Sequence, residues 1–203
     1  MIREITNRHE HGALVQAREN EVVVFARLEP RQGTDSVRRL AENIRRRANA
    51  EFPNDPLAMG IGRPVDALIG LRDSYREARQ AQTMARRLAE PNALYFGELN
   101  VYRLLFQLED NPELATFADE VLGSLIVYDR AQGTDLVQTL AAYFMHKGNL
   151  SQTAEALFVH RNTLLYRMER IKEIGGLDLD NPETRFNIQL ALRAHRLLSA
   201  REE

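Results

Sequence analysis

Four consecutive side chains around residue 160 are of types that can read the edges of DNA bases. Arg161 and Asn162 stand side by side, with His160 before them and Thr163 after them. Arginine can pair with guanine and asparagine with adenine in the major groove, and threonine can touch a thymine methyl group or a phosphate. At the start of a helix that enters the groove, His160, Arg161 and Asn162 would meet base edges. The residue types therefore indicate a surface for double-stranded DNA.

A second group of side chains is suited to DNA phosphates. Tyr166, Arg167 and Arg170 lie farther along the same segment, and Ser151 and Gln152 lie before it, where free backbone amides at a helix start also attract anions. Such contacts position a protein on DNA without specifying its sequence. The full set of expected DNA-binding residues is Ser151, Gln152, His160, Arg161, Asn162, Thr163, Tyr166, Arg167 and Arg170.

Two short helices are needed to present these side chains. Ser151 can cap a helix over Gln152–Phe158, and a second helix is expected over Arg161–Ile174. Helices of this length joined by a short turn form a helix-turn-helix unit. The packing side of the second helix is expected to hold Leu164, Leu165, Met168 and Ile171, and the free side Asn162, Thr163, Tyr166 and Arg170, with Arg167 at the edge.

Charge distinguishes this segment from the chain as a whole. The formal net charge is −2, which argues against binding DNA by bulk electrostatics, but residues 146–172 contain five lysine or arginine side chains and two glutamates. A second interpretation stays open. Adjacent short helices occur in any all-helical domain, and an exposed face of Arg, Asn and Tyr is often only solvated, so the helices could instead bind a partner protein.

One run of residues carries a resemblance to a known family. The run is Ala156-Leu157-Phe158-Val159-His160-Arg161-Asn162-Thr163-Leu164, followed by Tyr166-Arg167 and Gly176-Leu177-Asp178-Leu179. With its surroundings, Thr153 to Leu179, it closely resembles the C-terminal helix-turn-helix of the PucR/CdaR (sugar diacid regulator) family of bacterial transcription factors, itself similar to the DNA-binding end of the Fis protein. Phe158 stands where a generic motif favours glycine, and phenylalanine there fits this family. The resemblance implies sequence-specific DNA binding that regulates transcription.

The first third of the chain alternates strands and helices, as in an α+β domain. The expected order is β-β-α-β-α-β, over Ala13–Ala17, Glu21–Leu28, a helix from Gly33-Thr34-Asp35 to Ala50, Leu57–Gly62, Ala67–Leu88 and Ala93–Phe96. The stretch Leu57–Leu88, with Gly60-Ile61-Gly62-Arg63-Pro64, Ser74-Tyr75 and Glu77-Ala78, looks like the GGDEF-like domain that precedes the helix-turn-helix in such regulators. The two resemblances together cover essentially the whole chain.

The expected hairpin shows why catalysis is not predicted. In active diguanylate cyclases the Gly-Gly-Asp-Glu-Phe signature sits on a hairpin and holds substrate phosphate and metal. The corresponding residues, Gln16 to Glu21, contain neither a glycine pair nor an Asp-Glu pair, so we predict a non-catalytic domain without cofactor or metal. That fold normally begins with a strand and a helix ahead of this hairpin, so we expect the chain to be a C-terminal piece of a longer regulator.

The expected architecture is therefore α+β, a partial GGDEF-like α/β sandwich followed by an all-α helix-turn-helix domain. We place the GGDEF-like domain at 1–98, a helical connector at 99–130 and the helix-turn-helix domain at 131–203. Beyond residue 99 helices are expected over Val101–Leu108, Pro112–Tyr128 (with a possible break near Gly123), Thr134–Lys147 and Pro182–Ser199, in addition to the two described above. The clearest start is that of the last helix, where Asn181 can act as cap and Pro182 occupies the first position.

The expected partners follow from these assignments. One short recognition helix makes few base contacts, so we expect a homodimer on a palindromic site with half-sites ~34 Å apart or a multiple of it. The helices between Leu99 and Tyr128 and the GGDEF-like sheet are both candidates for the dimer surface. In this family the small-molecule effector is usually sensed by a domain N-terminal to these residues, and the protein is expected in the cytoplasm. The alternative is a protein-interaction or nucleotide-sensing module that does not read DNA.

Other suggestive residues have simpler interpretations. His9 and His11 lack a third metal ligand, and the arginines Arg38, Arg39 and Arg45-Arg46-Arg47 are expected on a solvated helix face. Gly60 and Gly62 lack the third glycine and the acidic residue of a dinucleotide fingerprint. The chain has no cysteine and no apolar run near the ~18 residues that span a bilayer, so no disulfide and no membrane contact are expected.

Overall fold

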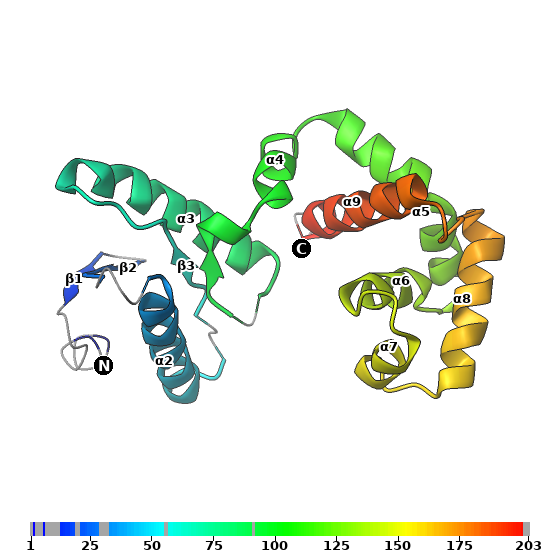
Figure 1. Cartoon of the computed structure of the whole chain (residues 1–203), viewed down its shortest axis with the longest axis horizontal. Coiled ribbons are helices and arrows are strands. Elements are labelled where there is room, and N and C mark those ends of the chain that lie inside the picture. Colours follow the sequence, from blue (N-terminus) through cyan, green and yellow to red (C-terminus); the bar gives the residue numbers. More distant parts are fainter. Residues whose placement is uncertain are drawn as a thin grey trace. The chain divides into compact units, whose positions relative to one another are not determined.

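The computed structural model of the chain describes residues 2, 6, 13–18, 21–28, 33–54, 57–90 and 92–200. It divides into two compact units, Met1–Val101 and Tyr102–Glu203, whose elements are labelled in Figure 1. The division lies close to the expected boundary after residue 98. No helix of the described part is both long enough and apolar enough to span a membrane.

The N-terminal unit has the predicted order of elements. They are β1 (Ala13–Ala17), β2 (Val22–Ala26), α2 (Asp35–Glu51), β3 (Gly60–Ile61), α3 (Leu71–Arg87) and β4 (Leu94–Tyr95), with 3-10 turns at Leu68–Gly70 and Phe96–Glu98. β1 and β2 pair antiparallel, with Val15 opposite Val24, and β3 pairs parallel with β4. Within the described residues these strands form two separate two-stranded sheets, and β3 and β4 are shorter than the sequence predicts.

Two glycines allow β3 and the residues after it to lie directly on α3. A Cβ atom at Gly60 would overlap the carbonyl oxygen of Ala78, and one at Gly62 would overlap that of Ser74. Only glycine lets two backbones approach so closely. These glycines therefore serve strand–helix packing.

A polar cluster ties the β1–β2 hairpin to α3. The Tyr75 hydroxyl donates a hydrogen bond to Glu21 Oε1 (2.7 Å), and Arg18 Nη1 donates to the Tyr75 hydroxyl (2.9 Å) and to Glu21 Oε1 (3.1 Å). The hydrogen bond from Tyr75 is the main cause that lowers the pKa of the Glu21 carboxyl. Glu21, expected at the position of a cyclase signature, binds side chains of its own unit.

Three of the five arginines of α2 are paired with acids, two along the helix and one with a later acid. Arg45 binds Glu42 (2.6 Å), Arg47 binds Glu51 (3.5 Å) and Arg38 binds Glu98 (2.6 Å). These ion pairs are the arrangement expected of a solvated helix face rather than of a phosphate site. His9 and His11 lie outside the described residues, and no group of three potential metal ligands occurs among those described.

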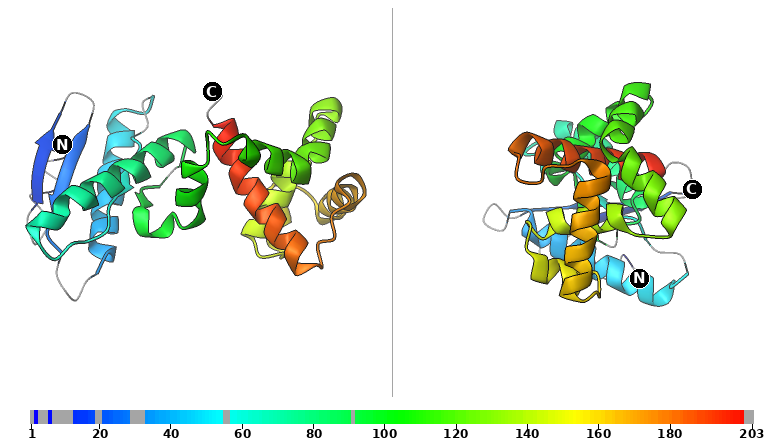
Figure 2. Two further views of the ribbon diagram at one scale, coloured as in Figure 1. Left: turned by 90° about the horizontal axis from the view of Figure 1, so that it is seen from above. Right: turned by 90° about the vertical axis from the view of Figure 1, so that its right-hand side faces the viewer.

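The C-terminal unit is built from helices, and those after residue 111 share one apolar core. They are α4 (Val101–Gln107), α5 (Pro112–Gln132), α6 (Leu136–Met145), α7 (Leu150–Ala156), α8 (Arg161–Gly175) and α9 (Pro182–Ser199). α5 packs against α6, α8 and α9. The core holds Leu122, Leu125, Leu136, Leu140, Leu164, Ile171 and Ile188, all at most 2% exposed. In Figure 2 (right), α8 lies in front of the other helices of this unit.

Helix α5 differs from its expected role. The sequence placed it in a connector over 99–130 and allowed a break near Gly123, but α5 is a single helix of 21 residues. Leu122 and Leu125 of this helix are fully buried in the C-terminal core, and Gly123 is buried without interrupting the helix. From Pro112 on, the expected connector therefore belongs to the all-α unit.

Helix boundaries follow recognisable caps. The side chains of Asn111 and Asn181 accept hydrogen bonds from the first turns of α5 and α9, with proline next to each. The predicted start of α9 at Asn181-Pro182 is confirmed. Gly133 ends α5 and Gly176 ends α8, both with a left-handed backbone.

The cluster on the hairpin gives a testable pH dependence. The pKa of Glu21 is lower in the folded chain than in an unfolded one, so its charged form stabilises the fold above the unfolded value, and this contribution is lost as the pH falls through the folded-state pKa. Tyr75→Phe removes the hydrogen bond that is the main cause of the lowered pKa of Glu21. We expect NMR titration of the variant to show the pKa of Glu21 shifted upward toward its ordinary value. Tyr102→Phe is the matched control, and an unchanged Glu21 titration in Tyr75→Phe would contradict the assignment.

Candidate nucleic-acid interface

Asn149 caps the start of helix α7, two positions earlier and with a different residue than predicted. Its side-chain oxygen accepts hydrogen bonds from the backbone amides of Ser151 (3.0 Å) and Gln152 (3.1 Å). Ser151 is therefore not the cap, because asparagine two residues earlier already occupies that role. The two amides expected to meet a phosphate are taken by Asn149, while the side chains of Ser151 and Gln152 are exposed.

The turn after α7 has a specific backbone geometry. α7 ends at Ala156 rather than at Phe158, and the amide of Val159 donates to the carbonyl of Ala154 (3.0 Å) while that of Phe158 donates to Glu155 (3.1 Å). This pair of hydrogen bonds is a Schellman motif, which requires a left-handed residue after the helix. Phe158 is that residue, with a φ of +54°.

His160 starts helix α8. Its ring nitrogen Nδ1 accepts a hydrogen bond from the backbone amide of Asn162 (3.2 Å). An accepting Nδ1 in a neutral ring leaves the hydrogen on Nε2, so the outer nitrogen of His160 is a donor. A hydrogen-bond donor is thus held next to Arg161 and Asn162 at the tip of the helix.

One face of α8 is buried and its first turns are exposed on the other. Leu164 and Ile171 are fully buried, and Met168 between them is nearly so. Arg161, Asn162, Thr163 and Tyr166 are exposed. The prediction that Leu165 packs inward is wrong, since Leu165 is 37% exposed. A residue one position after Leu164 is turned by about 100°, which carries it out of the buried stripe.

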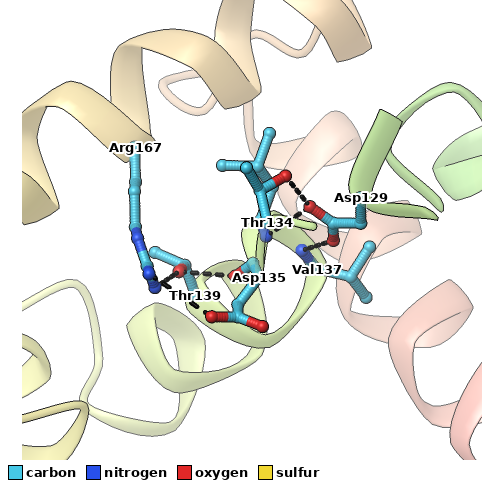
Figure 3. Close-up of polar contacts among 7 residues, drawn as sticks. Asp129, Thr134, Asp135, Val137, Thr139 and Arg167 are labelled. Carbon is cyan, nitrogen blue, oxygen red and sulfur yellow. Dashed lines mark hydrogen bonds and ion pairs between the residues drawn. The ribbon is translucent and has the colours of Figure 1, made fainter. Parts of the chain in front are cut away.

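Arg167 binds side chains of α6 instead of projecting freely. Its Nη1 donates to the Thr139 hydroxyl (3.1 Å) and its Nη2 pairs with Asp135 (3.3 Å), as Figure 3 shows. The Arg167 side chain is only 22% exposed. Thr139 is fully buried and donates its own proton to the carbonyl of Asp135 (2.7 Å). Arg167 therefore braces α8 against the start of α6.

Arg170 is likewise engaged with its own chain. Its Nη2 donates to the Tyr128 hydroxyl of α5 (3.1 Å), its guanidinium lies 5.2 Å from the centre of that ring, and Nη1 pairs with Glu173 (2.6 Å). These hydrogen bonds, that to Tyr128 first, raise the pKa of Arg170 above its usual value. A phosphate that binds Arg170 would have to share it with Tyr128 and Glu173.

Asp129 joins the end of α5 to the start of α6. Its carboxylate accepts hydrogen bonds from the Thr134 hydroxyl (2.6 Å) and from the amides of Leu136 (2.8 Å) and Val137 (2.9 Å), as seen in Figure 3. The side chain of Asp135, which directly precedes α6, makes no capping hydrogen bond. Asp129 thus caps α6 from another helix and fixes the element against which Arg167 is braced.

Charge favours the first half of α8 as the centre of the candidate interface. No acidic residue occurs between Glu155 and Glu169, and this interval contains His160 and Arg161. Glu169 and Glu173 are exposed on the second half of the helix. A polyanion would therefore be favoured most near the N-terminal end of α8, where the helix dipole also favours negative charge.

The structure brings most of the expected site residues to one region. The side chains of Ser151, Gln152, His160, Arg161, Asn162, Thr163 and Tyr166 are exposed on α7 and α8 or the turn between them. Sequence reasoning missed Asn149, which caps α7, and Asp129, which caps α6. Asn149 had a detectable signal, because asparagine is a preferred N-cap, whereas the partners of Asp129 depend on the tertiary fold.

Two domain families match the chain. Residues 136–194 match the PucR C-terminal helix-turn-helix domain, and residues 1–84 match the GGDEF-like domain. Both matches were anticipated from the sequence motifs.

Three proteins illustrate what the chain is similar to. A proline-responsive transcriptional activator, PutR, of Bacillus subtilis is 32% identical over 68% of this chain and 34% of its own length. The purine catabolism regulatory protein of the same bacterium is 31% identical over 81% of this chain and 30% of its own length. The carbohydrate diacid regulator of Escherichia coli is 34% identical over 59% of this chain and 31% of its own length. The matched region spans about a third of each of these relatives.

The cap formed by Asp129 can be tested by stability. Asp129→Ala leaves two backbone amides of α6 and the Thr134 hydroxyl without their acceptor, so we expect the free energy of unfolding to fall by about 1–3 kcal/mol. Urea unfolding followed by circular dichroism measures this. Asp119→Ala removes an exposed acid from the same helix and should change little. Equal effects of the two substitutions would show that Asp129 has no special role.

Proposed function

Because the chain belongs to the PucR/CdaR type of regulator, with a GGDEF-like domain followed by a PucR helix-turn-helix domain, we propose that it regulates transcription by placing α8 in the major groove of DNA. One observation supports this most. The first turns of α8 expose Arg161, Asn162, Thr163 and Tyr166 in an interval without acids, while the opposite face of the helix is buried. A rigid helix with such a face is what direct readout of bases requires.

We assign separate roles to the exposed side chains. Arg161 and Asn162 read base edges, guanine and adenine being their best partners, and His160 adds a donor through Nε2. Thr163 contacts a thymine methyl group or a phosphate. Ser151 and Gln152 on α7 and Tyr166 on α8 bind phosphates and set the position of the protein on the duplex.

Arg167 and Arg170 both bind side chains of their own chain, but they differ in how readily they would bind a phosphate. Arg170 has a 31% exposed side chain and shares its exposed end with Glu173, so it stays in the proposed phosphate-binding set. Arg167 uses both terminal nitrogens on Asp135 and Thr139. A phosphate at Arg167 would displace Asp135, and we therefore give Arg167 mainly the role of orienting α8.

We further propose that two copies bind one palindromic site. A single α8 offers few base contacts, and two copies related by a twofold axis would place their recognition helices ~34 Å apart or at a multiple of that distance. The surface that joins the copies lies either on the helices between Leu99 and Tyr128 or on the GGDEF-like unit.

The regulator would act in the cytoplasm, on the bacterial chromosome, in response to a small molecule. The three relatives described above are named as an activator and two regulators, which favours a regulatory role over an enzymatic one. Those names refer to proline, purine catabolism and carbohydrate diacids. Because the matched region is about a third of each relative, we assign effector sensing to a part of a full-length regulator outside this chain.

Selection of duplexes from a random pool tests base readout. We expect the purified chain to enrich a palindrome, with binding that weakens steeply as salt rises. Arg161→Ala and Asn162→Ala should each relax the preference at one base position, with a cost of about 1–3 kcal/mol there. Uniform loss of affinity for all sequences in both variants would contradict the base-readout roles. The absence of any enriched duplex would favour the protein-interaction alternative.

The role of Arg170 has its own test. Arg170→Ala should weaken binding to all sequences alike and reduce the slope of log affinity against log salt by about one unit. Tyr128→Phe is the matched variant, because it removes the hydrogen-bond partner and keeps the charge of Arg170. If both variants lower stability and neither changes the salt slope, Arg170 is an internal clamp and binds no phosphate.

A further inference from the structure

We infer that Phe158 is an additional DNA-contact residue, which packs against an apolar part of the duplex beside the bases read by α8. The apolar surface of DNA in reach of a groove comes from thymine methyl groups and from deoxyribose carbons. This inference rests on the proposed function, since it extends the same interface by one residue and one kind of contact.

Phe158 contributes almost nothing to the folded core. Its side chain is 96% exposed, the highest value among the large apolar side chains described as exposed. Its neighbours Leu157 and Val159 both pack against the core. A solvent-exposed aromatic ring does not gain the stabilisation that burial would provide. The stability of the fold therefore gives no reason for phenylalanine at this position.

The backbone at Phe158 is also unfavourable for phenylalanine. The Schellman motif that ends α7 needs a left-handed residue, and a side chain with a Cβ atom is strained there. The same unit uses glycine for this conformation at Gly133, after α5, and at Gly176, after α8, although Lys147 after α6 also has a positive φ. Glycine would thus be less strained in this turn. The chain instead has an aromatic ring here, which is exposed to solvent and attached to a strained backbone. Such a combination points to a contact outside the folded chain.

The position of the ring favours DNA as that contact. Phe158 lies two residues before His160 and three before Arg161, in the turn between the helices of the proposed interface. It belongs to the same interval without acids, so no carboxylate between residues 156 and 168 opposes a phosphate backbone nearby. Phenylalanine is among the side chains that contact the thymine methyl group in the major groove.

Substitution by glycine separates folding from binding. Phe158→Gly removes both the strain and the ring, so its melting temperature should stay equal to that of the parent chain or rise by a few degrees. Its affinity for the duplex recovered by selection should fall by about five- to tenfold, which corresponds to the loss of one apolar contact of ~1 kcal/mol. Phe158→Ala keeps the left-handed strain and should show the same loss of affinity without the gain in stability.

Two controls make the binding result specific. Phe186→Ala removes another exposed phenylalanine, 62% exposed on α9, which follows the opposite end of α8, and it should bind like the parent chain. The DNA affinity of Arg161→Ala tests the proposed interface itself. Replacing thymines one at a time by deoxyuridine then identifies the apolar partner, because this removes only the methyl group. If a replacement weakens DNA binding by the parent chain but not by Phe158→Ala, the partner of Phe158 is that methyl group. If Phe158→Ala loses affinity and no such position is found, the partner is a deoxyribose.

The possible failures can be told apart. If Arg161→Ala loses affinity and both Phe158 variants bind like the parent chain, the proposed function stands and the Phe158 contact is overturned. If Phe186→Ala loses as much affinity as Phe158→Ala, the effect is not specific and the contact is also overturned. If no duplex is recovered, or Arg161→Ala binds unchanged, the proposed function fails and the inference fails with it.

Discussion

The orientation of α8 about its own helix axis is the constraint on which the arrangement of the C-terminal unit depends. Leu164 and Ile171 are fully buried, and Met168 lies between them on the same stripe, so the helix can present only one face to solvent. Arg167 then fixes its position by pairing with Asp135 at the start of α6. The start of α6 is in turn held by Asp129 at the end of α5. Apolar packing thus sets the orientation of the exposed face, and a chain of polar contacts fixes its position.

Close backbone packing plays the corresponding part in the N-terminal unit. Gly60 and Gly62 let β3 and the following residue lie against α3 with no side chain between them. Arg63 directly after them donates through Nε to Glu77 of the same helix (2.9 Å). At the hairpin, Glu21 is bound by Tyr75 and Arg18. The polar groups nearest to the position of a cyclase signature are thus used to hold the unit together.

Local patterns in the sequence predict much of this structure. The order of strands and helices, the start of α9 at Asn181 and the helix-turn-helix follow from periodicity, caps and motif spacing. What the pattern missed depends on residues far apart in the chain. Asp135, which binds Arg167, and Tyr128, which binds Arg170, lie 32 and 42 residues away, so arginines that look free in the sequence are bound in the fold. Helix α5 joins the core for the same reason, because its neighbours α8 and α9 come much later.

The histidine that begins α8 also shows how a backbone hydrogen bond can select the form of a side chain. His160 closes the first turn because Nδ1 offers a lone pair to the amide of Asn162. A nitrogen that accepts this hydrogen bond carries no hydrogen of its own, so the hydrogen of the neutral tautomer lies on Nε2. The closing of one helical turn thereby selects the tautomer of a side chain that the sequence alone leaves undetermined.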